Sequence, residues 1–230
     1  MDLVRRIVRQ HAPQGRLLDV GCAQGTLGLS LAEDGFRVTL VDVRERCIEY
    51  ARERYERGDV DFHCGLLSPS LPPSNDYDMV ICTEVLEHVP APSWLLSALC
   101  SKARPGGHIL LTTPNSDYAF SRLPSYGRAA QQVIDGTEAN STDGDAHRFF
   151  YSREELISLV RGAGMRIKEH GFFSPFWLEG HLKTRVLHRV ADKAGLHAAL
   201  LAAVKGLAVN PIGSRRSCSA QWILATRDGT

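Results

Sequence analysis

Short apolar runs alternate along the chain with segments in which apolar residues recur every three or four positions. Runs of the first kind are typical of buried parallel strands, and segments of the second kind are typical of amphipathic helices. Helices are predicted at residues 3–11, 26–33, 45–55, 92–101 and 153–163, and strands at 17–20, 37–43, 60–64, 77–83, 109–113, 165–173 and 220–226. Alternation at this spacing predicts an α/β fold with a doubly wound parallel sheet.

The segment 16–43 is predicted to form a strand, a glycine-rich turn, a helix and a second strand. Gly21 and Gly25 in the turn tolerate unusual backbone angles, and they would let a ligand approach the backbone closely. The second strand ends near Asp42, whose carboxylate would be placed to accept hydrogen bonds from two adjacent ribose hydroxyls. The turn does not match the dinucleotide pattern G-x-G-x-x-G. The segment therefore indicates an adenosine-type cofactor, or else a close-packed strand-to-helix corner without a ligand.

Length, charge and cysteine usage restrict the class of protein further. A chain of 230 residues with 43% hydrophobic residues and a net charge of +1 fits one α/β domain over residues 1–230, and it indicates neither disorder nor a generic nucleic-acid binder. The six cysteines form no C-x-x-C pair, which favours a reducing cytoplasm. Because no apolar stretch approaches the length of a membrane span, we expect a cytoplasmic protein, attached at most to the membrane surface.

Several motifs together resemble those of one enzyme family. They are D-x-G-x-x-x-G from Asp19, T-E-V-L-E-H-V from Thr83, R-P-G-G from Arg104 and H-R-F-F-Y-S from His147. In this combination, over about residues 1–173, the chain resembles the class I S-adenosylmethionine (SAM) methyltransferases, and among them the ubiquinone-biosynthesis-type O-methyltransferases. The resemblance implies a Rossmann-like sandwich with a seven-stranded sheet, six strands parallel and the last antiparallel, and methyl transfer to an oxygen of a small or lipid-linked metabolite.

The same resemblance assigns the cofactor site. The residues expected to contact SAM are Asp19, Gly21, Cys22, Gly25, Asp42, Val43, Leu66 and Thr83. Asp19 would lie near the methionine ammonium. Leu66 departs from the family pattern, because many relatives carry an acid there that would bind the adenine amino group. We therefore expect the adenine to be held by apolar contact with Val43 and Leu66.

Methyl transfer to a hydroxyl also needs a group that removes a proton. Glu84, His88 and His147 are the candidates, and Glu84, Glu87 and His88 would share one face if their segment is helical. Together with His147 these three residues could hold a divalent cation such as Mg²⁺. The set also resembles the metal site of small-RNA 2′-O-methyltransferases, so RNA methylation is an alternative. Glu87 and His88 could instead cap a turn, and a non-catalytic SAM-binding protein is a further alternative.

Two insertions are expected to determine the acceptor. The first, at 116–146, is polar and lid-like, and the second, at 174–217, contains a basic helical segment. Residues 181–216 carry seven Lys or Arg against one Asp, so this segment has a charge of +6. Such a segment could bind an anionic membrane, or it could be a helical cover with a solvated basic face. Because few aromatic residues flank it, we rank nucleic acid behind a small-molecule or lipid-linked partner.

Overall fold

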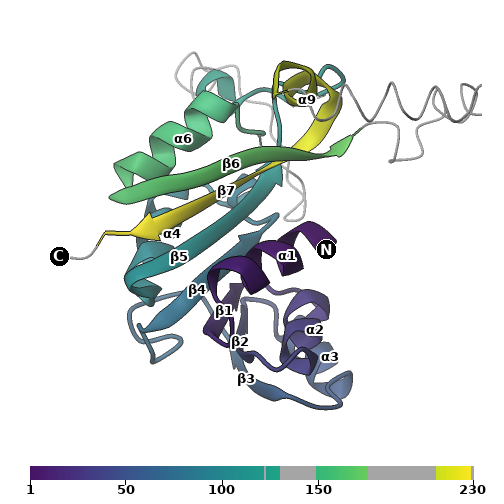
Figure 1. The fold of residues 1–230 in the computed structure, drawn as a ribbon, viewed down its shortest axis with the longest axis vertical. Coiled ribbons are helices and arrows are strands. Elements are labelled where there is room, and N and C mark those ends of the chain that lie inside the picture. Colours follow the sequence, from purple (N-terminus) through teal and green to yellow (C-terminus); the bar gives the residue numbers. More distant parts are fainter. Residues whose placement is uncertain (122, 130–148, 176–210, 229–230) are drawn as a thin grey trace, which may run out of the picture. The chain divides into compact units, whose positions relative to one another are not determined.

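The computed structural model describes residues 1–121, 123–129, 149–175 and 211–228 (Figure 1). The helices are α1 (Asp2–His11), α2 (Thr26–Glu33), α3 (Glu45–Glu53), α4 (Pro92–Lys102), α6 (Arg153–Gly162) and α9 (Pro211–Ser217), with a 3-10 helix, η1 (Leu86–His88). The strands are β1 (Arg16–Val20), β2 (Arg37–Asp42), β3 (Asp59–Cys64), β4 (Tyr77–Thr83), β5 (Ala103–Pro114), β6 (Met165–Pro175) and β7 (Cys218–Arg227). The predicted elements are confirmed, with ends that differ by one or two residues except in β5.

The strands form one seven-stranded sheet in the order β3-β2-β1-β4-β5-β7-β6 (Figure 1). Strand β7 runs antiparallel to both of its neighbours, and the other pairs are parallel. This arrangement confirms the prediction of a Rossmann-like methyltransferase sheet with an antiparallel last strand. The order changes direction between β1 and β4, which makes the carboxyl ends of these strands the expected ligand-binding edge.

The chain divides into two compact units, which we describe separately. Unit 1 contains Met1–Thr112, Ile157–Glu169 and Ile223–Thr230, and unit 2 contains Thr113–Leu156 and His170–Trp222. The organisation as one domain with insertions at 116–146 and 174–217 stays a prediction. Both insertions lie largely outside the described residues.

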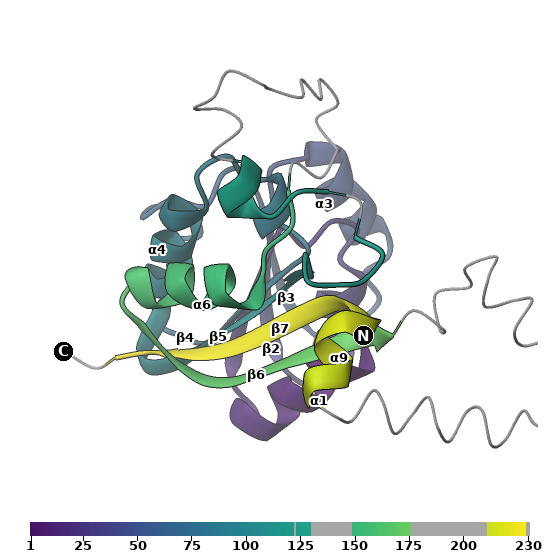
Figure 2. The same ribbon diagram turned by 90° about the horizontal axis from the view of Figure 1, so that it is seen from above.

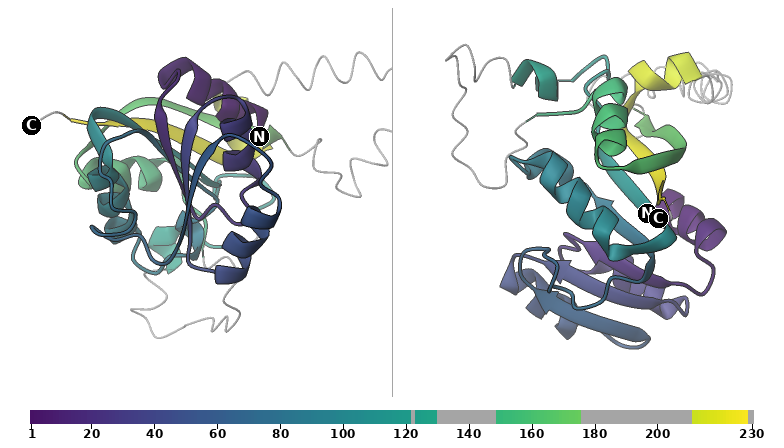
Figure 3. Two further views of the ribbon diagram at one scale, coloured as in Figure 1. Left: turned by 90° about the horizontal axis from the view of Figure 1, so that it is seen from below. Right: turned by 90° about the vertical axis from the view of Figure 1, so that its left-hand side faces the viewer.

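Unit 1 has helices on both faces of its strands. Figures 2 and 3 show α1 and α4 on opposite sides of these strands. Helix α1 buries Val4, Ile7 and Val8, as its apolar spacing predicts, whereas Arg5 and Arg9 on its polar side both donate hydrogen bonds to the Asp34 carboxylate. The apolar stripe of α1 therefore determines which of its faces packs on the sheet.

A fully buried lysine secures the loop between β3 and β4. Lys102, at the end of α4, donates hydrogen bonds from Nζ to the carbonyl oxygens of Pro69, at 3.1 Å, and Pro72, at 2.5 Å. Burial lowers the pKa of Lys102, since the charged form is disfavoured away from water. The same loop begins with Gly65 and Leu66, which belong to the predicted cofactor site. Lys102 thus links α4 to the loop that carries a predicted cofactor contact.

We expect Lys102→Met to lower the free energy of unfolding by about 2 kcal/mol, because two buried carbonyls lose a charged donor. Urea unfolding followed by circular dichroism would measure the change. Lys168→Met is the matched control, since Lys168 is exposed on β6 and its loss should leave the midpoint unchanged. Equal midpoints for all three proteins would mean that Lys102 does not secure the loop.

Candidate functional site

The predicted cofactor residues of unit 1 lie along one edge of the sheet. In the register of the parallel strands, Val20 of β1 pairs with Val41 of β2 and with Cys82 of β4, and Asp42 pairs with Cys64 of β3. Four strands therefore end at the same level. Their next residues bring together the glycine turn after β1, the acid that ends β2, the loop after β3 and Thr83 at the end of β4.

The turn between β1 and α2 is closed by backbone hydrogen bonds and needs its glycines. The N–H groups of Gly21 and Cys22 both donate to the carbonyl oxygen of Val41, at 2.8 and 3.1 Å. Gly21 has a φ of +70°, and a Cβ there would lie 2.4 Å from Cγ2 of Val85. Gly25, with a φ of +71°, precedes α2 as its N-cap. Val85 excludes a side chain at Gly21, and the positive φ disfavours one at Gly25, so the turn needs glycine at both positions.

Asp42 is held rigidly where β2 ends. Its side chain is only 2% exposed, and its carboxylate accepts hydrogen bonds from the backbone N–H groups of Ala23, at 2.8 Å, and Arg44, at 2.9 Å. The guanidinium of Arg44 adds an ion pair. Burial by itself would raise the pKa of Asp42, but the hydrogen bonds from Arg44 and Ala23 outweigh it and hold this pKa below its usual value. The carboxylate is therefore a fixed, ionised acceptor.

Asp19 is the second buried acid of the site, and it lacks the donors that surround Asp42. Its side chain is 1% exposed, and its Oδ1 atom has no hydrogen-bond partner among the residues that the structure describes. Burial, and then the charge of Asp42, raise the pKa of Asp19 to about 7. A buried polar atom without a partner is costly in a folded chain. Its position beside the glycine turn therefore fits a cationic ligand group such as an ammonium.

Two exposed apolar side chains lie in the segments that are tied to Asp42. Val43, directly after Asp42, is 60% exposed, and Leu66, directly after the glycine that follows β3, is 61% exposed. The backbone N–H of that glycine, Gly65, donates to the carbonyl oxygen of Asp42 at 2.9 Å, which ties the two segments together. Exposed apolar residues beside a fixed acid fit an aromatic base next to its ribose.

Cys22 is not a reactive thiol. It is nearly buried, and burial, followed by the charges of Asp19 and Asp42, raises its pKa well above the usual value for a thiol. The neutral thiol is a poor nucleophile. Its role at the turn is therefore restricted to packing and to its backbone N–H.

The segment after β4 does not form the single helical face on which three predicted residues would lie. Glu84 has a φ of +55° and lies outside η1, whereas Glu87, within η1, is completely buried. His88 is half-buried. Among the described residues, no three His, Cys, Asp or Glu side chains are grouped so that they could hold a metal ion. His147, the fourth predicted ligand, lies outside the described residues.

Glu84 is anchored to the neighbouring strand in spite of its unusual backbone angle. Its N–H donates to the carbonyl oxygen of Thr112 at 3.0 Å, and its carboxylate accepts a 2.8 Å hydrogen bond from the hydroxyl of the same residue. A non-glycine residue in the left-handed region is strained, and such residues concentrate at functional sites. β5 thus holds Glu84 in a defined position at the carboxyl edge of β4.

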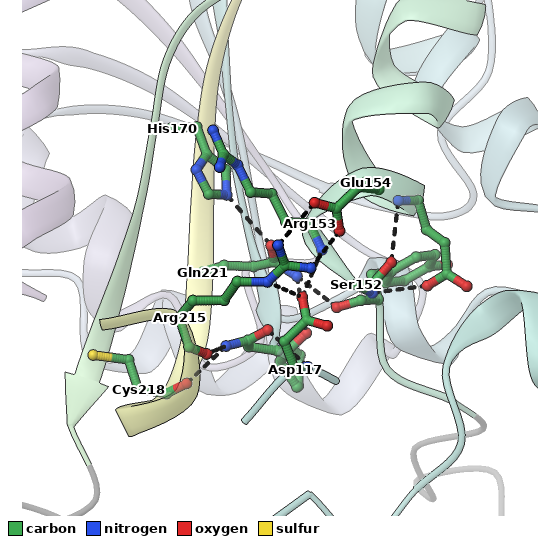
Figure 4. A network of polar contacts seen from close by, with 12 residues as sticks. Asp117, Ser152, Arg153, Glu154, His170, Arg215, Cys218 and Gln221 are labelled. Carbon is green, nitrogen blue, oxygen red and sulfur yellow. Dashed lines mark hydrogen bonds and ion pairs between the residues drawn. The ribbon is translucent and has the colours of Figure 1, made fainter. Parts of the chain in front are cut away.

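In unit 2, polar contacts join the described ends of both insertions (Figure 4). Arg215 of α9 donates from Nε to Asp117 at 3.0 Å, and it forms a bidentate ion pair with Glu154 of α6. The amide of Asn115 donates to the carbonyl oxygens of Arg215 and Cys218. Arg215, which was counted among the basic residues of a membrane-binding segment, is therefore engaged within unit 2. The other basic residues of that segment, except Arg216, lie outside the described residues.

The comparisons with known proteins agree with this geometry. The family model described as a methyltransferase domain matches residues 1–170. The chain belongs to the methyltransferase-domain family. A ubiquinone biosynthesis O-methyltransferase of Hydrogenovibrio crunogenus is 33% identical over 156 residues, which are 66% of this chain and 63% of that relative. The predicted family resemblance is confirmed, and the chain spans a little less than two thirds of that relative's length.

Solved structures share the fold of this methyltransferase-domain chain. A SAM-dependent methyltransferase from Methanosarcina mazei superposes with a TM-score of 0.63 at 16% identity, over 97% of this chain and 98% of that one. The magnesium protoporphyrin IX methyltransferase from Synechocystis PCC 6803, solved with bound SAH, gives a TM-score of 0.58 at 17% identity, over 99% and 80% of the two chains.

No helix within the described ranges is both long and apolar enough to span a bilayer.

Sequence reasoning missed two residues that shape the site of this methyltransferase-domain chain. Arg44 contacts Asp42 directly, and Lys102 secures the loop of Leu66 from a distant helix. The proximity of Arg44 to Asp42 in sequence was visible, but a charged residue at a helix start is usually solvated. The burial of Lys102 had no signal in the sequence, because lysine in the last turn of a helix usually faces water.

Proposed function

We propose that this chain is a SAM-dependent methyltransferase that transfers a methyl group to an oxygen of a small or lipid-linked metabolite. The observation that carries the proposal is the Asp42 carboxylate, fixed by the N–H of Ala23 from the glycine turn and flanked by the exposed Val43 and Leu66. A fixed acid between a glycine turn and two exposed apolar side chains suits a ribose diol with its adenine. Membership of the methyltransferase-domain family supports the same cofactor.

The residues present fit SAM at its ribose, its adenine and its ammonium group. Asp42 would accept the ribose hydroxyls, Val43 and Leu66 would contact the adenine, and Asp19 would face the ammonium with its otherwise unpartnered Oδ1. Gly21, Cys22, Gly25 and Thr83 would complete the site around the turn and the end of β4. When bound, SAM supplies an electrophilic methyl group for an in-line displacement, and the chain must align the acceptor with it.

A hydroxyl acceptor has to lose its proton, and Glu84 is a supported candidate for this role. Its carboxylate is exposed and is oriented by the Thr112 hydroxyl at the carboxyl edge of β4. His88, a few residues later, and His147 are the other proposed bases. Removal of the proton by one of these groups would make the acceptor oxygen nucleophilic at the moment of transfer.

The divalent cation remains a separate proposal, with Glu84, Glu87, His88 and His147 as its ligands, and it requires Glu87 to leave its buried position in η1. If these residues hold Mg²⁺, methyl transfer should stop in excess chelator and return when Mg²⁺ is added. Glu87→Ala and His147→Ala should then reduce the rate to a similar extent, since either change disables the same site. Full turnover in excess chelator would contradict the metal proposal. Glu84, His88 and His147 would then stay candidates for proton transfer only.

The class of acceptor is inferred from the relative in Hydrogenovibrio crunogenus, which is a ubiquinone biosynthesis O-methyltransferase. The test is a screen with methyl-labelled SAM against lysate fractions separated into lipids, small metabolites and RNA. We expect label in a lipid or small-metabolite fraction, and none when the Asp42→Ala variant replaces the wild type. Label in RNA would favour the alternative of 2′-O-methylation, and label in no fraction would favour a non-catalytic SAM-binding protein.

We also propose that the segment 181–216 attaches the protein to anionic membranes, which would suit a lipid-linked acceptor. Lys183, Arg185, Arg189 and Lys193 supply charge there, and each basic residue near an anionic bilayer contributes roughly 1 kcal/mol. The protein should sediment with anionic vesicles at low salt and not with neutral ones. Replacing Arg185, Arg189 and Lys193 with Gln should weaken sedimentation and leave SAM affinity intact. Equal, negligible sedimentation with both vesicle types would exclude attachment.

A further inference from the structure

The acceptor positions of the Asp42 carboxylate are all occupied by donors of the chain itself. Oδ1 accepts from the backbone N of Arg44 at 2.9 Å and from its Nε at 3.1 Å, and Oδ2 accepts from the backbone N of Ala23 at 2.8 Å and from Nη2 of Arg44 at 3.3 Å. A carboxylate offers about four such positions. A ribose diol, which brings two hydroxyl donors, can therefore bind Asp42 only if two of the present donors leave.

The two backbone donors are poor candidates for leaving. The N–H of Ala23 belongs to the glycine turn, and that of Arg44 belongs to the start of α3, so moving either would disturb the fold of unit 1. The side chain of Arg44, by contrast, is 52% exposed. An ion pair with one partner this exposed contributes little to stability, and a released guanidinium is readily hydrated.

The guanidinium also resembles the ligand in the way it binds. Its Nε and Nη2 direct two roughly parallel N–H groups at the two oxygens of one carboxylate, as the two hydroxyls of a cis-diol would. We infer that Arg44 is an internal competitor for the ribose position: its side chain occupies Asp42 in the free protein and leaves when the cofactor binds. This inference rests on the proposed adenosine-type cofactor and names a residue that sets its affinity.

The exchange has a physical consequence for turnover. When a ligand departs, the two acceptor positions that its hydroxyls filled lose their donors, and the return of the Arg44 side chain fills them again. The same contact must be broken on binding, which weakens the observed affinity. Arg44 would thus trade affinity for easier release of the demethylated cofactor.

The test compares Arg44→Ala with Arg46→Ala in the full chain. Arg46 is a matched control, because it is an exposed arginine on the same helix and no hydrogen bond or ion pair to Asp42 is observed for it among the described residues. The probes are SAH, adenosine and 2′,3′-dideoxyadenosine, titrated by calorimetry or, for weak binding, by nuclear magnetic resonance. The two nucleosides are uncharged, so removing a cation from the site does not by itself favour them.

We expect adenosine and SAH to bind Arg44→Ala about two- to fivefold more tightly than the wild type, the range that corresponds to loss of a weak ion pair. The dideoxy analogue should bind both proteins equally, because it has no diol that must displace the arginine. Arg46→Ala should behave as the wild type with every probe. Arg44→Lys should give a smaller gain, since lysine keeps the charge without the two parallel donors.

Unchanged or weaker adenosine binding to Arg44→Ala would overturn the inference, because it would mean that Arg44 leaves Asp42 accessible or supports the bound ligand. An equal gain for the dideoxy analogue would also overturn it, since Arg44 would then hinder the nucleoside in general and not compete for Asp42. Failure of SAH and adenosine to bind any of the proteins, wild type included, would instead contradict the proposed cofactor itself.

Discussion

Asp42→Ala should weaken the binding of SAH by about 2 to 3 kcal/mol, roughly 30- to 150-fold in Kd. The variant removes a charged acceptor that would bind both ribose hydroxyls, and hydrogen bonds to a charged group are the stronger kind. Ala23 and Arg44 keep the carboxylate in place, so the wild type does not have to order it on binding. Calorimetric titration of SAH into each protein would give the two Kd values.

Two variants separate this effect from a general loss of folding. Asp59→Ala removes an exposed acid at the start of β3, far along the strand from the carboxyl edge, and should bind SAH as the wild type does. Asp42→Asn keeps the shape of the side chain but loses the charge. Its Kd for SAH should lie between those of the wild type and Asp42→Ala. An Asp42→Ala protein that folds and binds SAH with unchanged affinity would remove Asp42 from the cofactor site.

The central strands of the sheet could be predicted because they are buried on both faces. Continuous apolar runs such as residues 79–82 of β4 are typical of buried strands, and the glycines between such runs mark the turns. The prediction was least accurate at β5, which begins at Ala103 and not at residue 109, because the R-P-G-G sequence reads as a turn. Helix α9 was not predicted as an element of its own, since a short segment with Gly213 and four serines or arginines shows no helical periodicity.

The grouping of the candidate cofactor residues at one edge of the sheet was predictable for a similar reason. Asp42 and Gly21 take their positions from the ends of strands, and strand ends follow from the apolar pattern. The positions of the candidate catalytic and metal-binding residues depended on local backbone geometry. The spacing of Glu84, Glu87 and His88 fits one face of an α-helix, but the left-handed conformation of Glu84 and the short 3-10 turn direct Glu87 into the core. The sequence pattern does not predict a positive φ at Glu84, because the contacts that hold this residue come from the neighbouring strand β5.

The same dependence on tertiary context separates the two buried acids. Asp19 and Asp42 both lie in apolar runs of the sequence, yet Asp42 gains four donors whereas Oδ1 of Asp19 has no partner among the described residues. Their pKa values accordingly move in opposite directions. A site with one ionised and one readily protonated carboxylate has a pH-dependent charge, which the sequence does not reveal.

The stability of the protein without cofactor should therefore fall as the pH rises from about 4 to about 7. The pKa of Asp19 is about 7 in the folded chain and near its ordinary value of 3.8 in the unfolded chain, so between these values the folded state holds a proton that the unfolded state has released. The free energy of unfolding then decreases by up to about 4 kcal/mol as the pH rises, and it levels off above pH 7.

Asp19→Asn should remove this dependence on pH and be the more stable protein at pH 8. Urea unfolding at pH 4 to 8 would measure it, with the exposed Asp61→Asn as a control that keeps the wild-type slope. Parallel curves for the wild type and Asp19→Asn would show that Asp19 is ionised in the folded chain throughout this range.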